Sequence, residues 1–194
     1  NAWQYTWHVQ HDVPGLIQLF GGEEPFLNKL DSLFTVKLEG ESLSDVTGLI
    51  GQYAHGNEPG HHTIYMYNRV GRPDKTQKYV NQVLTTLYDN TPAGICGNED
   101  TGQMSAWYVF SSLGFYPMNP ASGQYELGAP LFRKAVIRLA SGKKLVIRAD
   151  NLSDENIYVD KVYLNGQLLD RTYITFEEVQ QGGELRFEMK GDDL

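Results

Sequence analysis

The stretch GICGNEDTGQMSAWYVFSSLGFYP, residues 94–117, decides how this chain is interpreted, because three polar residues directly precede one of its most apolar helical segments. The polar residues are Asn98, Glu99 and Asp100. In segment 104–113, apolar residues recur at helical spacing and most other faces are apolar too, which predicts a helix buried on several sides. The stripe expected to face inward consists of Ala106, Val109, Phe110 and Leu113.

Asp100 has two interpretations that can hold together. Its spacing to Gln103 fits a capping box with Asp in place of Ser or Thr, so its carboxylate would accept a bond from a free N–H of the first helical turn. A cap needs only one residue, however, and Asn98 and Glu99 precede it. Clustered carboxylates suit acid–base chemistry, since burial and a like charge shift one pKa toward neutrality. A helix N-terminus favours the ionised form, which suits a base.

Composition narrows the class of protein. The 194 residues are 41% hydrophobic and 12% aromatic, which suits one globular domain or two small ones. A formal net charge of −8 argues against binding to nucleic acid or to an anionic membrane surface. The single cysteine, Cys96, excludes an internal disulfide and has no basic neighbours, so we expect it to be packed and inert. No apolar run is long enough for a membrane span.

The first 120 residues carry the signals of helices. Helix starts are marked by Asp12 with Pro14, by Pro25, and by Pro73 with Asp74, and Gly21-Gly22 ends the first helix. Segments 2–9, 43–53 and 61–70 are predicted as further helices. The expected inward faces are Leu16, Ile17 and Phe20; Phe26, Leu30 and Leu33; and Tyr79, Val80, Val83, Leu84, Leu87 and Tyr88.

After residue 120 the pattern changes to short, β-branched and often alternating segments. They are KAVIRL, KKLVIRA, IYVDKVYL, TYITF and ELRFEM, separated by Ser141-Gly142, Asn165-Gly166 and Gly182-Gly183. Asn-Gly between apolar strands is a strong hairpin signal. We predict an antiparallel β-sandwich, or part of one, over residues 124–190. The predicted class is therefore α+β, with a helical domain over 1–120 and a β-rich domain over 121–194.

A second polar cluster lies in YAHGNEPGHHTIYMYN, residues 53–68. Its spacing matches neither HExxH nor a Cys/His finger, so the zinc signal is weak, and a surface loop of hydrogen-bonded histidines is the plain alternative. Oxygen donors there suit Ca²⁺ better than zinc. Gly and Pro place the cluster on a loop entering a helix, where binding residues gather. The residues are His55, Asn57, Glu58, His61 and His62.

The first eleven residues, NAWQYTWHVQH, form a third cluster. Trp3 and Trp7 are four residues apart and can simply be core. Trp3 and Gln4 on the wall of a cleft could equally form a platform for a sugar, which offers an apolar ring face and polar hydroxyls. The chain opens without an initiator Met or a signal-peptide pattern, which predicts a fragment or a processed chain.

The three clusters resemble glycoside hydrolase family 92 α-mannosidases. The matching stretches are NAWQYTWHVQHDVPGLIQLFGG, NEPGHHTIYMYN, GRPDKTQKYV and GNEDTGQMSAWYVFSSLGFYPMNPASGQYELGAPLF, and with the later segments the resemblance covers essentially the whole chain. It implies an N-terminal β-sandwich followed by an (α/α)₆ barrel. It also implies a calcium-dependent, exo-acting and inverting α-mannosidase of bacterial glycan degradation. Inversion uses a carboxylic acid and a basic carboxylate roughly 6.5–9.5 Å apart.

The resemblance also suggests roles for individual residues. Asp100 takes the position of the general base. Many members carry a second Asp two positions earlier, where this chain has Asn98, so a helper carboxylate is missing or Glu99 serves instead. Asn57 and Glu58 fall at the expected calcium site. The residues expected to bind substrate are Trp3, Gln4, His55, Glu58, His61 and His62.

The resemblance places the general acid just upstream of Asn1, outside this sequence. We therefore expect a mannose-containing glycan as substrate and the N-terminal remainder of the enzyme as partner, with periplasmic or secreted localisation by family habit. The alternative is a carbohydrate-binding or structural domain that kept the fold without the chemistry. Either way, the 194 residues are expected to be inactive alone.

Overall fold

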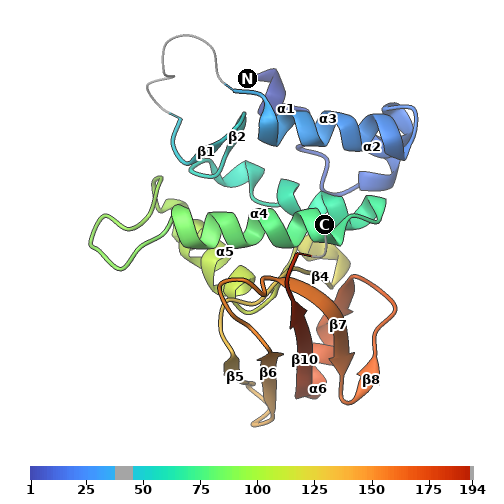
Figure 1. Ribbon diagram of the computed structural model, residues 1–194, viewed down its shortest axis with the longest axis vertical. Helices are drawn as coiled ribbons and strands as arrows, with labels where there is room; N and C mark the ends of the chain where they lie inside the picture. Colours follow the sequence, from blue (N-terminus) through green and yellow to red (C-terminus); the bar gives the residue numbers. More distant parts are fainter. Residues whose placement is uncertain (38–45, 193–194) are drawn as a thin grey trace.

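The chain has an α+β fold in which most helices lie at one end of the molecule and most strands at the other. The computed structural model describes residues 1–37 and 46–192. Figure 1 shows α1, α2 and α3 forming one layer, with β1 and β2 beside it, α4 and α5 the next layer, and β5 to β8 and β10 the far end. The helices are α1 (Ala2–Tyr5), α2 (Val13–Leu19), α3 (Glu23–Thr35), α4 (Pro73–Thr86), α5 (Gln103–Ser112) and α6 (Phe176–Gln181). No helix within the described ranges is long and apolar enough to cross a bilayer.

The first long helices begin close to where the sequence predicts them. The Asp12 carboxylate accepts a hydrogen bond of 2.9 Å from the Gly15 N–H and caps α2. α4 begins at Pro73, as predicted, whereas α3 begins at Glu23, two residues before Pro25. The buried faces of α3 and α4 include Phe26, Leu30, Leu33, Tyr79, Val80, Val83 and Leu84, which confirms the predicted stripes up to Leu84. Leu87 and Tyr88 of the second stripe follow the end of α4 and are half-buried.

Three predicted helices differ from the structure. The first ends at Tyr5 instead of residue 9. Residues 61–70 form the 3₁₀ helix η2 (Thr63–Val70), whose side chains are almost all buried. The helix predicted over 43–53 is wrong in its described part, where β1 (Leu49–Ile50) pairs with β2 (Tyr53–Ala54). The start of that predicted helix lies outside the described residues.

The burial of α5 also differs from the prediction. Its inward face consists of Met104, Trp107 and Ser111, while Val109 from the predicted stripe is 54% exposed. α5 packs against α4 on one side and against β3 on another, and its remaining face meets solvent. An almost uniformly apolar helix has no strong periodic signal, so its neighbours decide which side is buried.

Apart from the pair β1 and β2, the described strands form two sheets beyond the long helices. β5 (Lys134–Arg138), β6 (Lys144–Asp150), β10 (Gly183–Lys190), β7 (Tyr158–Leu164) and β8 (Gln167–Leu168) form a five-stranded sheet in that order. β3 (Phe115–Tyr116), β4 (Gln124–Leu127) and β9 (Tyr173–Thr175) form a three-stranded sheet. The short helix α6 connects β9 to β10, and its capping box joins Thr175 and Glu178. The 3₁₀ helices η1 (Glu58–Gly60), η3 (Asp100–Gly102) and η4 (Pro120–Ser122) lie in loops.

The predicted antiparallel arrangement holds for every described strand pair except one. β10 runs parallel to β6 and antiparallel to β7. The parallel pairing arises because β7, β8, β9 and α6 intervene between β6 and β10, so the chain crosses over before it returns. The Asn165-Gly166 hairpin is confirmed between β7 and β8, with both residues at positive φ.

The two sheets share one core. Phe115 and Leu127 from the three-stranded sheet pack in the same buried cluster as Ile147, Leu185 and Phe187 from the five-stranded sheet. A separate cluster fills the helical end and includes Trp7, Phe26, Tyr67 and Trp107. The strand-bearing end therefore packs against α5 through β3, while the helical end carries the loops with the polar clusters at 55–62 and 98–100.

A buried ion pair joins the two ends. Arg69 on η2 pairs with Glu126 on β4, whose side chain is 1% exposed. Asn68 donates a hydrogen bond of 3.1 Å to the same carboxylate and one of 2.9 Å to the Leu127 carbonyl. Burial raises the pKa of Glu126, although Arg69 acts in the opposite direction. Because Glu126 is desolvated, its negative charge depends on Arg69 for stabilisation inside the protein.

We predict that Arg69→Met lowers the free energy of unfolding by about 3 kcal/mol, because it leaves the Glu126 charge buried without its partner. The double variant Arg69→Met/Glu126→Gln should recover most of that loss, since a neutral amide can still accept from Asn68. Urea unfolding followed by circular dichroism measures both. Equal stability of the single and double variants would contradict the role of the ion pair.

Candidate active site

Two loops cross at a contact between glycines. A Cβ atom built on Gly97 would lie 2.5 Å from the Gly56 carbonyl oxygen, and one on Gly56 would lie 2.1 Å from Thr47 Oγ1. Neither position has room for a side chain. The crossing brings the loop before Asn57 against the loop before Asn98. Beside it lies a hollow of about 410 Å³ lined by Thr47, Gly56, Ile95, Cys96, Gly97 and Asn98.

The structure brings Glu58 and Asp100 together. The Asp100 backbone N–H donates a hydrogen bond of 3.2 Å to Glu58 Oε1. Asn57 is exposed directly before Glu58. The polar cluster at 55–62 and the cluster at 98–100 are therefore one site, although more than forty residues of sequence separate Glu58 from Asp100.

The capping box predicted for Asp100 and Gln103 is wrong. Gly102 is the N-cap residue of α5 and provides no side-chain bond. Glu99 takes the capping role instead: Ser105 N–H donates to both carboxylate oxygens, at 3.1 and 3.3 Å, and Ser105 Oγ also bonds to Oε2. Gln103 is directed elsewhere, and its amide bonds to His61 Nδ1 and to the Tyr116 hydroxyl.

The backbone after Asp100 turns through an uncommon conformation. Thr101 has φ 54° and ψ 24°, in the left-handed region, and Gly102 follows with φ 81°. A β-branched residue there is strained, and such strain gathers at functional sites. The Thr101 hydroxyl donates a hydrogen bond of 2.7 Å to the Asp100 carbonyl. Because of this bend, the backbone at Asp100 does not continue along the axis of α5.

The carboxylate of Asp100 is left available for chemistry. Asp100 is exposed, and in the described part of the chain no residue donates a hydrogen bond to its side chain. Glu99 differs, because Ser105 donates hydrogen bonds to both of its carboxylate oxygens, and these bonds lower the pKa of its carboxyl group. A base needs free lone pairs to take a proton. This comparison favours Asp100 over Glu99 as a base.

His55 is buried at the centre of the helical end. Tyr53 Oη lies 2.8 Å from His55 Nδ1, and Tyr88 Oη lies 2.7 Å from His55 Nε2. Tyr88 donates its own proton to the Met104 carbonyl at 3.1 Å, so His55 Nε2–H must donate to Tyr88 and Tyr53 must donate to Nδ1. One neutral tautomer satisfies the whole chain of bonds. Burial accordingly lowers the pKa of His55 well below its usual value.

His61 and His62 are also buried. His61 Nε2 lies 2.9 Å from the His55 carbonyl oxygen, and His62 Nε2 lies 2.6 Å from the Trp7 carbonyl oxygen. Burial lowers the pKa of each to about 4. The alternative interpretation of this cluster was a surface loop of hydrogen-bonded histidines. His61 and His62 are hydrogen-bonded, but they lie inside the protein instead of on its surface. Their assignment, with His55, to substrate binding stays a prediction that this burial disfavours.

Trp3 and Gln4 occupy the edge of the same helical end. The Lys29 ammonium lies 3.6 Å from the centre of the Trp3 ring, and the Gln4 amide donates to the Gln52 carbonyl at 3.4 Å. Gln4 and Asn57 line one small cavity of about 10 Å³. That volume suits one water molecule and no sugar. The role of Trp3 and Gln4 as a sugar platform stays a prediction.

Asn57 and Glu58 have the donor chemistry of calcium ligands without forming a complete shell. Calcium takes six to eight oxygens. Glu58 Oε1 accepts from the Asp100 N–H, whereas Oε2 accepts from no residue in the described part of the chain. Among the described residues, no group of three or more His, Cys, Asp or Glu side chains is arranged to hold a metal. Further ligands would have to come from water, from substrate hydroxyls or from other protein segments.

The residues that the sequence analysis missed are the ones that hold the site. Ser105 fixes Glu99, Tyr88 anchors His55, and Gln103 joins His61 to Tyr116. Tyr88 was predicted only as part of an apolar stripe. Nothing in the local sequence signals a hydroxyl partner 33 residues away.

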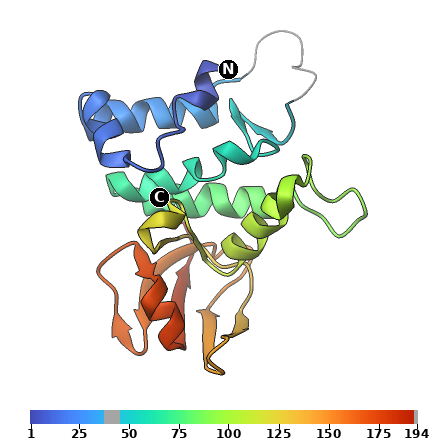
Figure 2. The same cartoon turned by 180° about the vertical axis from the view of Figure 1, so that it is seen from behind.

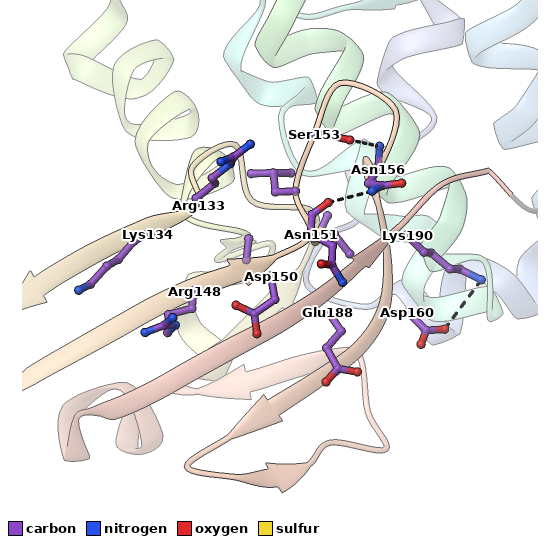
Figure 3. A pocket seen from close by; sticks show the side chains of 13 residues that line it. Arg133, Lys134, Arg148, Asp150, Asn151, Ser153, Asn156, Asp160, Glu188 and Lys190 are labelled. Carbon is purple, nitrogen blue, oxygen red and sulfur yellow. Dashed lines mark hydrogen bonds and ion pairs between the residues drawn. The ribbon is translucent and has the colours of Figure 1, made fainter.

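A larger hollow lies elsewhere on the surface. It has a volume of about 1170 Å³ and is formed by β5, β6, β7 and β10 with the loop after β6. Figure 3 shows its charged lining, including Arg148, Asp150 and Glu188, and the ion pair between Lys190 and Asp160. None of the residues singled out in the sequence lines it. Its size therefore gives no reason to move the candidate site away from Asp100.

Comparisons with known proteins agree with the resemblance. The profile described as "Glycosyl hydrolase family 92 catalytic domain" matches residues 1–191. A GH92 α-mannosidase from Bacteroides thetaiotaomicron, solved with mannoimidazole, is 44% identical with a TM-score of 0.93 over 98% of this chain and 25% of its own. A GH92 inverting mannosidase of the same organism is 42% identical, with a TM-score of 0.85 over 98% of this chain and 27% of its own.

A relative from a fungus extends the comparison. An uncharacterized secreted glycosidase of Arthroderma benhamiae is 30% identical over 188 residues, which cover 95% of this chain and 22% of that protein. The chain therefore spans about a quarter of the length of the relatives it matches.

The buried histidines predict a pH dependence of stability. The folded pKa of His62, about 4, lies below its usual value of 6.5. The unfolded state binds the proton more readily, so stability is complete above pH 6.5 and is lost as pH falls toward 4. His62→Gln keeps an N–H donor for the Trp7 carbonyl but does not titrate. Between pH 6.5 and pH 4, the free energy of unfolding of His62→Gln should fall less steeply than that of the wild type. The two slopes should differ by up to about 1.4 kcal/mol per pH unit.

Urea unfolding of both proteins at several values between pH 4 and pH 7 measures the difference. Parallel curves for wild type and His62→Gln would show that His62 titrates normally and is not held neutral by the fold.

Proposed function

This chain belongs to glycoside hydrolase family 92, and we propose that it supplies the base side of the active site of an inverting, exo-acting α-mannosidase. Its helices would then be the C-terminal part of an (α/α)₆ barrel. The observation that carries the proposal is the Asp100 carboxylate, which is exposed beside the crossing of two loops while its backbone is fixed by Glu58 and Thr101. The substrate would be a glycan with a terminal α-linked mannose.

In this proposal Asp100 takes a proton from water. The water attacks the anomeric carbon on the face opposite the leaving group, while a carboxylic acid protonates the glycosidic oxygen, and the sugar leaves with inverted configuration. Asn98 cannot share the proton as a second carboxylate would. Glu99 is unsuited as a substitute base, because Ser105 engages both of its oxygens. Asp100 would therefore act as the single base.

We propose that the acid comes from protein outside these 194 residues. The chain spans about a quarter of its relatives, so the whole active site would need the remaining segments as a partner. Exposed apolar side chains on the helical end, such as Leu19 at 86% and Val109 at 54%, fit contact with such segments. A non-catalytic role for the isolated chain follows from the same reasoning. Secretion or periplasmic export is proposed by analogy with the secreted fungal relative.

We propose calcium as the metal, with Asn57 and Glu58 among its oxygen ligands. Calcium would supply charge to orient sugar hydroxyls. Within this chain, Glu58 would link the metal position to the base, because its other oxygen already accepts the Asp100 N–H.

We predict that Asp100→Asn in the full-length enzyme lowers kcat by about 10²–10⁴-fold, since the amide cannot take the proton from water. The fold should survive, because the Asp100 side chain is exposed and does not cap α5. Hydrolysis of an α-mannoside, together with the melting temperature, measures both. Near-normal kcat in this variant would show that another group is the base.

We predict that EDTA abolishes activity of the full-length enzyme and that Ca²⁺ restores it better than Zn²⁺, because the donors on this loop are oxygens. Calorimetric titration of the metal-free enzyme with Ca²⁺ or Zn²⁺ measures metal binding independently of turnover. Full activity in excess EDTA would remove the metal from the proposal.

We predict that residues 1–194 alone hydrolyse no aryl α-mannoside and self-associate or bind hydrophobic dyes through their uncovered apolar side chains. Turnover and light scattering test this. Measurable turnover would mean that a carboxylate of this chain, with Glu58 the nearest candidate, serves as the acid. A compact monomer without dye binding would contradict the proposed contact with missing segments.

A further inference from the structure

Neighbouring carboxylates at the start of α5 are used in different ways. Glu99 accepts three hydrogen bonds from Ser105, whereas Asp100 accepts none from the described residues. Asp100 nevertheless has the sequence spacing to Gln103 that a capping residue would have. The residue expected to cap the helix is therefore free, and the residue before it caps in its place.

The two carboxylates compete for the same helix terminus. The first N–H groups of α5 have no partner within the helix, and the partial positive charge there attracts a carboxylate. Asp100 is close enough along the chain to reach them, since it precedes the first residue of α5 by only three positions. Ser105 N–H is already occupied by Glu99 at 3.1 and 3.3 Å.

Backbone geometry favours the observed choice. The left-handed conformations of Thr101 and Gly102 bend the chain between Asp100 and α5. The Glu58 carboxylate and the Thr101 hydroxyl hold the Asp100 N–H and carbonyl, respectively, directly before that bend. A strained bend persists only when surrounding bonds fix it.

We propose that Glu99 is a positioning residue: by occupying the first turn of α5, it keeps the Asp100 carboxylate out of the helix cap and free to face water. This inference rests on the proposed role of Asp100 as the base. Glu99 would affect catalysis only by positioning Asp100 and would transfer no proton itself.

Two substitutions separate this role from the others. Glu99→Gln keeps an acceptor oxygen for the Ser105 N–H, so the cap stays filled and Asp100 stays free. Glu99→Ala vacates the cap, and Asp100 can then turn toward the N–H of Ser105 or Met104. A misplacement of about 1 Å in a catalytic group can lower a rate by about 10²-fold.

The test is steady-state kinetics of the full-length enzyme with an aryl α-mannoside. We expect Glu99→Ala to lower kcat by about 10- to 100-fold with little change in KM, and Glu99→Gln to keep most of the wild-type kcat. A crystal structure of Glu99→Ala should show the Asp100 carboxylate accepting from an N–H of the first turn of α5. If Glu99→Ala does not fold, Ser105→Ala removes one of the donors that hold Glu99 and should lower kcat in the same direction.

Three results would overturn the inference. Equal losses in Glu99→Gln and Glu99→Ala would make Glu99 a chemical participant. Unchanged kcat in Glu99→Ala would show that the cap does not control Asp100. A lower melting temperature with Asp100 in its original orientation would make Glu99 merely structural. Asp100→Asn in the same assay separates these results from failure of the proposed function, because an active Asp100→Asn would reject the base itself.

Discussion

The buried chain of hydrogen bonds through His55 is the constraint on which the candidate site depends. It runs from Tyr53 through His55 and Tyr88 to the Met104 carbonyl, and so it connects β2, the segment after α4 and the first turn of α5. The ring centres of Trp107 and His55 lie 4.4 Å apart, and Trp107 Nε1–H donates a hydrogen bond of 3.1 Å to the His61 carbonyl. Because Tyr53, His55 and Trp107 are buried, losing one partner would leave a buried polar group unpaired at a cost of about 1–3 kcal/mol.

This fixed interior explains why the exposed residues above it are placed as they are. The crossing of Gly56 and Gly97 sets the distance between the two loops, and Glu58 then reaches the Asp100 backbone. The loop between α4 and α5 projects from the helical end in both views, so the site lies at the base of a protruding segment (Figure 2). The rigid part of the molecule therefore consists of buried histidines and tyrosines, and the chemistry is assigned to a carboxylate that nothing in the described chain covers.

Local signals in the sequence predicted local structure well. The Asp12 cap, the Pro73 start and the Asn165-Gly166 hairpin each depend on residues within a few positions, and each is confirmed. Predictions that depended on distant partners did less well. The burial of Val109 and the pairing of β10 beside β6 follow from packing that no window of sequence contains. Helix α6 had a local signal, Thr175 with Glu178, that the strand pattern around it obscured.

The candidate site shows the same division. The motif around Asp100 could be recognised from the sequence, but its contact with Glu58 could not, because the two residues are 42 positions apart. The exchange of the cap from Asp100 to Glu99 could not, because it depends on the left-handed backbone of Thr101, a conformation that a β-branched residue rarely adopts. The internal role of His55 was equally hidden, since polar residues in a Gly- and Pro-rich loop are usually exposed.

The most direct test of the account is chemical rescue of Asp100→Ala in the full-length enzyme by azide. Removing the carboxylate leaves space for a small anion on the face of the sugar where water attacks. If Asp100 is the general base of an inverting mannosidase, azide restores turnover of an activated α-mannoside and the product is β-mannosyl azide. No rescue, or an α-mannosyl azide product, would contradict the assignment of Asp100 to that face.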